Sequence, residues 1–353
     1  MSETADTIRA DILSYIDSKY DSLPGSLVFE ISQGLAQTLE SKYVEAEDAL
    51  QQKFAGTADF DNLKVIAYER GVDWKDATAA HGLVTIVGVV GTVIPIGTAV
   101  ANTTNEYLTT AEATIGIDGT VSVAVSCSTL GLNGNTAIGT ITIFPKTISG
   151  LNTVTNPIAF SNGYAAETRD ELLARYYAEI RTPATSGNSY HYQKWALSIS
   201  GVGSVKVKPL WNGNGTVKVV IITSNKEIAT TELINQVAAY IETVRPIGPQ
   251  ITVTTAETLP INVSAKISLE ENYVLADVKA AITANIQAFF KEITFDKTSV
   301  FYAKVGNIIF DTAGVTNIDY SAFTLNGAST DVTLIDNNIK TQIPILGTIS
   351  VTV

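Results

Sequence analysis

The sequence predicts an α+β multidomain protein with N-terminal helices, a small all-β domain, and one or two split α/β sandwich modules. Apolar residues recur at steps of three or four in the first part of the chain, which is typical of amphipathic helices. Only Glu106, Glu112, Asp118 and Lys146 are charged between residues 77 and 166, where β-branched residues and turn-forming glycines dominate. Helical and strand patterns alternate afterwards. We therefore expect four domains, at residues 1–76, 77–165, 166–257 and 258–353.

The composition of the chain disfavours some classes of function. The 353 residues carry a formal net charge of −12, and the first 76 hold fifteen acidic against seven basic residues. A net-negative chain without a Lys/Arg stripe lacks the electrostatic footprint of nucleic-acid binding. The single Cys127 cannot form an internal disulfide, and the first residues are acidic and amphipathic rather than signal-like. We expect assembly in a cytoplasm.

The N-terminal region predicts two amphipathic helices. Ile8, Ile12 and Ile16 recur at four-residue spacing in the first, and Pro24 opens a second that continues to Phe54. At ~1.5 Å per residue the second helix would be about 46 Å long. Its apolar stripe is formed by Leu27, Ile31, Leu35, Leu39, Tyr43, Ala46, Leu50 and Phe54.

Two interpretations of this stripe remain open. In one, the first helix and residues 60–68 cover it in a local helical hairpin. In the other, part of the stripe packs against helices of a partner in a bundle.

The most apolar segment, residues 83–101, is long enough to span a bilayer as a helix. Its glycines, Pro95 and β-branched residues instead favour short strands, and it lacks flanking Lys/Arg and an aromatic belt, so we expect no membrane association. Further strands are predicted at 106–109, 113–117 and 120–126, with Asp118-Gly119 as a hairpin turn between the last two. The domain should be a β-meander or small sandwich.

The central segment predicts an α-β-β-α-β order. Thr168 and Glu171 have the spacing of a capping box, which starts a helix that runs to Arg181 and ends before Pro183. A second helix is predicted at 190–199, followed by strands at 204–209 and 216–223, a helix at 232–244 and a strand at 251–255. This order is typical of a split α/β sandwich.

The last segment shows a weaker repeat of the same pattern. Residues 306–335 resemble residues 192–221, because Gly314-Val315 matches Gly201-Val202 and Asn326-Gly327 matches Asn214-Gly215. With a strand at 261–267 and a helix at 275–290, we expect a related second module that ends in edge strands at 347–353. A different strand order in the two modules would contradict this hypothesis.

Motifs for enzymatic chemistry are missing from the sequence. It contains no P-loop, no H-E-x-x-H and no C-x-x-C, and His81 and His191 are its two imidazoles. His191 lies in a predicted helix beside tyrosines, where a packed or exposed histidine is commoner than a catalytic base. The paired carboxylates lie near turns and helix starts. We therefore expect no catalytic residues, no cofactor and no metal.

Three segments in order carry a family resemblance. They are GTVIPIGTAV (91–100) with YLTTAEATI (107–115) and GLNGNTAIGTI (131–141), then the loop and helix at 154–181, then the Y-x-x-W-A helix and strands at 189–221. Together they resemble the Baseplate J-like family, the wedge proteins of contractile phage tails and phage-tail-like particles. Ser161-Asn162-Gly163 departs from the glycine pair that many members carry there.

The resemblance implies a structural wedge component of a baseplate, located in a virion or particle and assembled in the bacterial cytoplasm. It implies association with other wedge subunits through N-terminal helices and self-association through C-terminal modules, with hub or spike and sheath-initiating proteins nearby. Partner-binding residues would be Ile8, Ile12, Ile16, Leu27, Ile31, Leu35, Leu39 and Tyr43.

The resemblance also implies that the protein links wedges into a ring around the hub and relays the contraction trigger. Residues 73–81 and 151–166 would then serve as hinges or as static linkers. The alternative function is a receptor-binding or adhesin-like tail protein, because Thr-rich β-domains often present binding loops.

Overall fold

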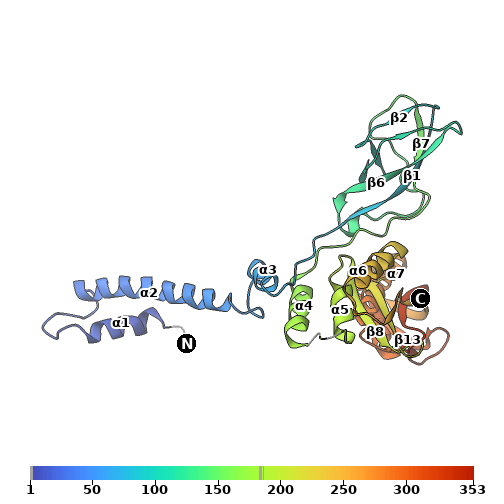
Figure 1. Cartoon of the computed structure of the whole chain (residues 1–353). Coiled ribbons are helices and arrows are strands. Elements are labelled where there is room, and N and C mark those ends of the chain that lie inside the picture. Colours follow the sequence, from blue (N-terminus) through green and yellow to red (C-terminus); the bar gives the residue numbers. More distant parts are fainter. Residues whose placement is uncertain (1–2, 183–184, 186) are drawn as a thin grey trace. The chain divides into compact units, whose positions relative to one another are not determined.

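A computed structural model of the chain describes residues 3–182, 185 and 187–353 (Figure 1). The chain divides into two compact units. The first unit contains Met1–Trp74 and Glu167–Thr182, and the second contains Lys75–Ala166 and Pro183–Val353. The mixed helix and sheet content confirms the α+β multidomain class.

The first unit is helical, with α1 (Ala5–Ser14), α2 (Leu27–Gln51), α3 (Phe60–Tyr68) and α4 (Arg169–Arg181). The boundaries predicted for the first two helices were wrong. Helix α1 stops before Ile16, because Asp17 accepts the Lys19 amide at 3.0 Å and starts a local turn. Helix α2 begins after Ser26, whose side chain accepts the Phe29 amide, so Pro24 lies before the helix.

Helices α3 and α4 share one small core. Leu63 and Ala67 of α3 pack with Leu172 of α4, and Phe60 and Trp74 border them. Thr168 and Glu171 form the predicted capping box, and α4 ends at Arg181; Pro183 lies outside the described residues. The expected boundary at residue 166 grouped α4 with the central module, whereas its contacts group it with α3. The four-domain division itself stays a prediction.

Residues 79–155 of the second unit form a β-domain. Its elements are β1 (Ala79–Gly88), β2 (Val93–Ile94), β3 (Ala99–Ala101), β4 (Glu106–Thr109), β5 (Ala113–Thr114), β6 (Thr120–Leu130), the 3-10 turn η1 (Leu132–Gly134) and β7 (Leu151–Thr155). The main sheet has the order β3-β4-β6-β1-β7, and β2 pairs with β5.

The prediction of a simple meander was therefore wrong, because β1 inserts between β6 and β7. The predicted turn at Asp118-Gly119 is present, with Gly119 at φ 74°, but β5 pairs with β2 rather than with β6. The apolar segment forms strands β1, β2 and β3, which confirms the prediction of strands there. In the core of the domain, Ile86 and Ile94 are fully buried, and the buried Tyr107 hydroxyl donates to the Gly134 carbonyl at 2.9 Å.

The central module follows the predicted order, with α5 (Ser189–Leu197), β8 (Val202–Pro209), β9 (Thr216–Thr223), α6 (Thr231–Val244) and β10 (Gln250–Thr255). Its sheet has the order β10-β9-β8, in which β9 is antiparallel to β8 and parallel to β10. Leu233, Val237 and Ile241 of α6 are buried in the core between the helices and the sheet.

The C-terminal module contains β11 (Glu257–Leu269), α7 (Leu275–Ile293), β12 (Ser299–Val300), α8 (Tyr302–Phe310), β13 (Val315–Leu325), β14 (Val332–Thr333) and β15 (Gln342–Thr352). Its sheet has the order β13-β11-β15, with β11 antiparallel to β13 and parallel to β15. The predicted edge strand at 347–353 lies in β15.

The repeat hypothesis fails on strand order. In the central module the middle strand, β9, directly follows the antiparallel edge strand β8. In the C-terminal module the middle strand, β11, precedes both helices, and β14, the counterpart of β9 in the sequence comparison, pairs with β12 instead. The similar turn residues therefore reflect similar local chemistry rather than the same module topology.

The two α/β modules pack on each other within the second unit. Val220 and Ile222 of β9 form a buried cluster with Ala256 and Ile343. Beside it, Lys206 and Lys208 contact the two carboxylate oxygens of Asp336 at 2.7 and 2.6 Å. Burial acts to raise the pKa of Asp336, but the hydrogen bonds from both lysines outweigh it and hold that pKa below its ordinary value.

Lys218 completes the polar border of this contact. Its ammonium donates to the carbonyls of Asn338 and Ile339 at 3.2 and 2.9 Å and lies 4.1 Å from the Trp211 ring centroid. Burial lowers the pKa of Lys218. Residues 336–339 are thus fixed on the sheet of the central module.

Replacing Asp336 by Asn should lower the free energy of unfolding by about 2–3 kcal/mol, because both lysines would lose their carboxylate partner. The folded-state pKa is depressed, so the stabilisation is complete above roughly pH 4 and is lost as the pH falls through the folded-state value. Urea unfolding at pH 7 and at acidic pH measures both effects. The exposed Glu271→Gln serves as control; equal stability of Asp336→Asn and the parent at pH 7 would contradict the assignment.

Candidate partner-binding surface

Helix α1 packs antiparallel on one face of α2 (Figure 1). Ile8 of α1 is only 5% exposed, and the buried residues of α2 are the small Ser32 and Ala36. Small residues let two helices approach closely. Arg9 adds a hydrogen bond to Gln33 and a cation–π contact, with its guanidinium carbon 4.9 Å from the Phe29 ring centroid. The hairpin is therefore held by one specific face of α2.

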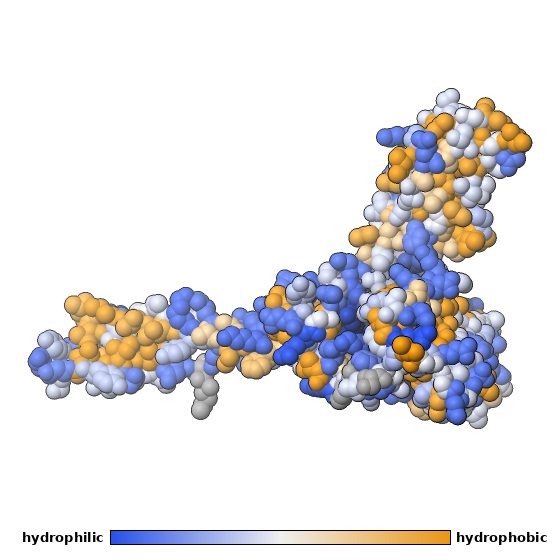
Figure 2. Space-filling model, in the orientation of Figure 1, coloured by the Kyte–Doolittle hydropathy of each residue, from blue (hydrophilic) through white to orange (hydrophobic). Residues whose placement is uncertain are grey.

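A second face of α2 stays exposed. Leu27, Ile31 and Leu35 follow one another at four-residue spacing, so they lie on one side of the helix. Their exposed fractions are 76%, 61% and 48%. Figure 2 shows hydrophobic residues gathered along the α1–α2 hairpin. We call Leu27, Ile31 and Leu35 the α2 stripe.

Gly34 lies beside the α2 stripe. A glycine inside a helix costs about 1 kcal/mol relative to alanine. A Cβ added at Gly34 would meet no atom of the described chain within 4 Å, so packing inside this chain does not require a glycine there. A helix of another molecule could approach the α2 backbone closely at this position. The sequence analysis missed Gly34, although a glycine within an otherwise regular helical pattern is a visible signal.

Helix α2 also extends past its partner. It has 25 residues against ten in α1. Beyond the part that α1 covers, Tyr43, Val44 and Leu50 are each about half exposed, and Phe54 follows in the next turn with 59% exposure. The apolar surface therefore continues along the hairpin.

The residues predicted to bind partners fall into three groups. Ile8 is buried inside the hairpin, where it packs α1 on α2. Ile12 and Leu39 are half-buried, and Ile16 lies in the turn after α1. The exposed members are Leu27, Ile31, Leu35 and Tyr43, and Ile16 is exposed as well, at 37%. Binding of partners by these residues stays a prediction.

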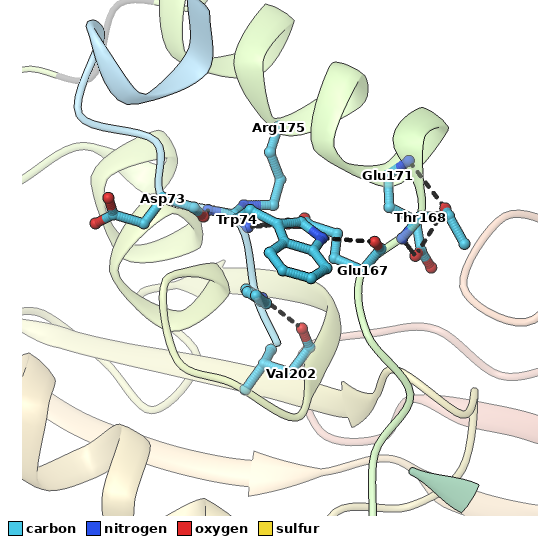
Figure 3. Close-up of polar contacts among 8 residues, drawn as sticks. Asp73, Trp74, Glu167, Thr168, Glu171, Arg175 and Val202 are labelled. Atoms are coloured by element: carbon cyan, nitrogen blue, oxygen red, sulfur yellow. Dashed lines mark hydrogen bonds and ion pairs between the residues drawn. The ribbon is translucent and has the colours of Figure 1, made fainter. Parts of the chain in front are cut away.

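The local hairpin interpretation is confirmed for the first helix, which packs on α2, but it was wrong for residues 60–68, because α3 packs on α4 instead. This contact lies where the chain leaves for the β-domain and returns from it (Figure 3). The Trp74 indole donates to the Glu167 carbonyl at 2.8 Å, and Arg175 binds the Glu167 carboxylate at 2.7 Å and the Asp73 carbonyl at 3.0 Å. We call Asp73, Trp74, Glu167 and Arg175 the junction cluster.

The segments predicted as hinges are partly structured. Residues 151–155 form β7, and residues 79–81 belong to β1. Between β1 and the junction cluster, the Thr78 amide donates to the Tyr164 carbonyl at 2.9 Å. Asn162 exchanges two hydrogen bonds with the backbone of His81, at 2.9 and 3.0 Å. The outgoing and returning segments are thus tied to each other.

In the part of the chain that the structure describes, the two histidines do not converge with other reactive groups on one centre. His81 Nε2 lies 3.2 Å from Glu232 Oε1 at a hollow of about 190 Å³, but both side chains are about half exposed or more, at 49% and 64%. The neighbouring Asn162 and Thr78 already bond the backbone there. His191 accepts the Gly187 amide and stacks on Trp195, which confirms its packed helix-face position.

Among residues 3–182, 185 and 187–353, no three His, Cys, Asp or Glu side chains gather closely enough to hold a metal ion. Within the same residues, no helix has the length and apolar character needed to cross a bilayer.

Comparison with known proteins gives the family. Residues 83–163 match the Baseplate J-like protein barrel domain, residues 184–255 the Baseplate J-like central domain, and residues 261–352 the Baseplate J-like protein C-terminal domain. The phage-like element PBSX protein XkdT of Bacillus subtilis (strain 168) is 30% identical over 357 residues, covering 99% of this chain and 97% of that protein. The chain belongs to the Baseplate J-like family and is a baseplate structural protein.

Two further similarities extend the comparison. The baseplate protein gp47 of Escherichia phage Mu is 30% identical over 284 residues, covering 76% of this chain and 77% of that protein. A chain of the anti-feeding prophage baseplate, solved by cryo-EM, aligns over 95% of this chain and 89% of its own length, with a TM-score of 0.40 and 10% identity.

Replacing Arg175 by Met should destabilise the first unit by about 2–3 kcal/mol, because the Glu167 carboxylate, whose side chain is 5% exposed, would lose the two hydrogen bonds that it accepts from Arg175. The double variant Arg175→Met/Glu167→Gln should recover part of this loss. Thermal unfolding followed by circular dichroism measures the effect, with the exposed Glu47→Gln as control. A single variant as stable as the control would contradict the role given to the junction cluster.

Proposed function

We propose that this protein is a wedge component of the baseplate of a contractile tail or phage-tail-like particle. In this role it links wedges into a ring around the hub and relays the trigger for contraction. Membership of the Baseplate J-like family supports the location in a virion or particle baseplate. The observation that carries the finer role is the exposed α2 stripe.

The α2 stripe supports docking against helices of other wedge subunits. Fully burying a large aliphatic side chain contributes about 1.5–3 kcal/mol, so three such residues supply several kcal/mol to an interface. Leucine and isoleucine at four-residue spacing form the ridge that a helix inserts into the groove of another helix. The gap at Gly34 then receives a side chain of the partner. The hairpin thus contributes two helices to a bundle that other subunits complete.

The junction cluster supports the relay of movement. The first unit ends at Trp74 and resumes at Glu167, and these two residues are bonded to each other. The chain segments that lead to the β-domain therefore start from one fixed point. Displacing the hairpin moves both segments together, and residues 75–78 and 156–166 absorb the change in backbone dihedrals.

The modules of the second unit supply the remaining contacts in this proposal. The C-terminal module pairs with a second copy of the chain to connect neighbouring wedges. Hub or spike proteins and sheath-initiating proteins lie nearby in the particle. Assembly takes place in the bacterial cytoplasm.

Ile31→Asp and Leu35→Asp, introduced together, should abolish incorporation into particles and leave the isolated chain folded, because both side chains are exposed. Complementation of a deletion strain, followed by particle purification and immunoblotting, measures incorporation. Gln37→Asp, at an exposed position off this stripe, is the matched control. Normal incorporation of the double variant would reject docking through the α2 stripe, and assembly with loss of target binding alone would favour the adhesin alternative.

Gly34→Leu tests the close approach of a partner helix. The substitution should raise the stability of the isolated chain by roughly 0.5–1 kcal/mol, because glycine is a poor helix former and the added side chain meets open space. The same variant should reduce incorporation into particles, because the leucine fills the gap beside the stripe. Incorporation at the parent level would show that no helix approaches the backbone at Gly34.

A further inference from the structure

Strand β15 lies at the edge of its sheet and carries no charge. Its one paired neighbour in the described sheet is β11, so its outer side is a free edge in this part of the chain. Residues 341–353 contain no Asp, Glu, Lys or Arg. Natural edge strands are commonly protected against pairing by charges, prolines or bulges. Strand β15 has Pro344 and a register shift between residues 346 and 349, but residues 348–352 contain neither charge nor proline, so this part of the edge is a template for another strand.

The two halves of β15 differ in protection. In the first half, the Gln342 amide donates to the Ile335 carbonyl at 2.7 Å, and Pro344 has no amide hydrogen. In the second half, the Thr348 amide donates to Asn262 Oδ1 of β11 at 2.8 Å. Backbone groups alternate in direction along a strand, so Ile349 and Val351 present theirs to the outer side. The free edge is therefore residues 348–352.

The side chains of this free edge form a palindrome. Read in either direction, residues 348–352 give a hydroxyl, a β-branched aliphatic, a hydroxyl, a β-branched aliphatic and a hydroxyl residue, in the sequence TISVT. Thr348, Ser350 and Thr352 are exposed, whereas Ile349 and Val351 pack toward the core of the module. When two copies are placed antiparallel around Ser350, each hydroxyl residue faces a hydroxyl residue and each β-branched aliphatic residue faces another.

We infer that residues 348–352 pair antiparallel with the same residues of a second copy, with Ser350 opposite Ser350 on the two-fold axis. Thr348 then faces Thr352 of the other copy, and Ile349 faces Val351. Hydroxyl pairs and β-branched pairs across strands are favourable, each contributing about 0.2–1 kcal/mol. The absence of charge in this segment matters, because two chains of net charge −12 repel wherever acidic surfaces meet.

The two-fold axis keeps both modules on the same side of the joined sheet. Strands β13, β11 and β15 of one copy continue into β15, β11 and β13 of the other, which gives six strands. Because the axis is perpendicular to the sheet, the helices that cover the sheet of each copy lie on one common face. The inference rests on the proposed self-association of C-terminal modules and names the strand and register that perform it.

Cysteine cross-linking of the full chain tests this register. Ile349 and Val351 exchange the backbone hydrogen bonds in this register, so Ser350 faces its counterpart in a non-hydrogen-bonded pair with a Cα separation of about 4.5 Å, which a disulfide can span. Ser350→Cys should therefore give a disulfide-linked dimer under mild oxidation. Thr348→Cys should not, because the two copies of residue 348 would lie four residues apart, roughly 13 Å at ~3.3 Å per residue. A mixture of Thr348→Cys and Thr352→Cys chains should cross-link to each other.

The parent chain is the control for background, because its Cys127 is buried. Non-reducing electrophoresis should show at least tenfold more dimer for Ser350→Cys than for Thr348→Cys. Equal cross-linking of both variants, or none for Ser350→Cys, would overturn the inference.

A charge pair gives a second measurement without covalent trapping. Ser350→Lys and Ser350→Glu, each alone, should be monomeric in sedimentation velocity, because like charges would meet on the two-fold axis. Their mixture should form a heterodimer. Because residue 350 is exposed, neither change should affect folding. Equal association of the separate variants and the mixture would reject the pairing.

Failure of the strand pairing can be distinguished from failure of docking through the α2 stripe. Ile31→Asp/Leu35→Asp chains that carry Ser350→Cys should still cross-link, because the two surfaces lie on different parts of the chain. Failure of cross-linking in a chain that still incorporates into particles would reject the strand pairing and leave the proposed function intact.

Discussion

The incomplete cover of α2 by α1 is the constraint on which the proposed function of this chain depends. A ten-residue helix can bury one face of a 25-residue helix, and it does so over Ser32 and Ala36, where small side chains allow close contact. Leu27, Ile31 and Leu35 are left in water on another face. Burial of apolar surface is the main favourable term in association, so this arrangement stabilises a complex more than it stabilises the isolated hairpin.

Elsewhere in the molecule, specific internal contacts hold the parts of each unit together. The junction cluster joins two distant chain segments through Trp74, Glu167 and Arg175. The two α/β modules are held together by an apolar cluster and by Asp336 between Lys206 and Lys208. Internal contacts of this kind stabilise each unit, and the hairpin and the edge of β15 are the surfaces that we propose for contacts with other molecules.

Much of the fold was predictable from the sequence, because local signals and tertiary packing agree there. The capping box at Thr168 and the strand at 216–223 were placed correctly. Predictions failed where pairing is not local: β1 inserts between β6 and β7, and β11 takes the middle of the last sheet. For the site, periodicity identified the stripe, but it could not show that Ile8 is buried, because that depends on which face α1 covers.

Hydrogen exchange of the α2 backbone tests the central claim most directly. Amides of residues 27–38 would be compared between the isolated chain and the assembled particle by mass spectrometry. If the α2 stripe is buried by partner helices, these amides should exchange at least tenfold more slowly in the particle, and amides of the fully buried strand β9 should change little. Equal exchange of residues 27–38 in the two states would contradict the claim that this surface exists for assembly.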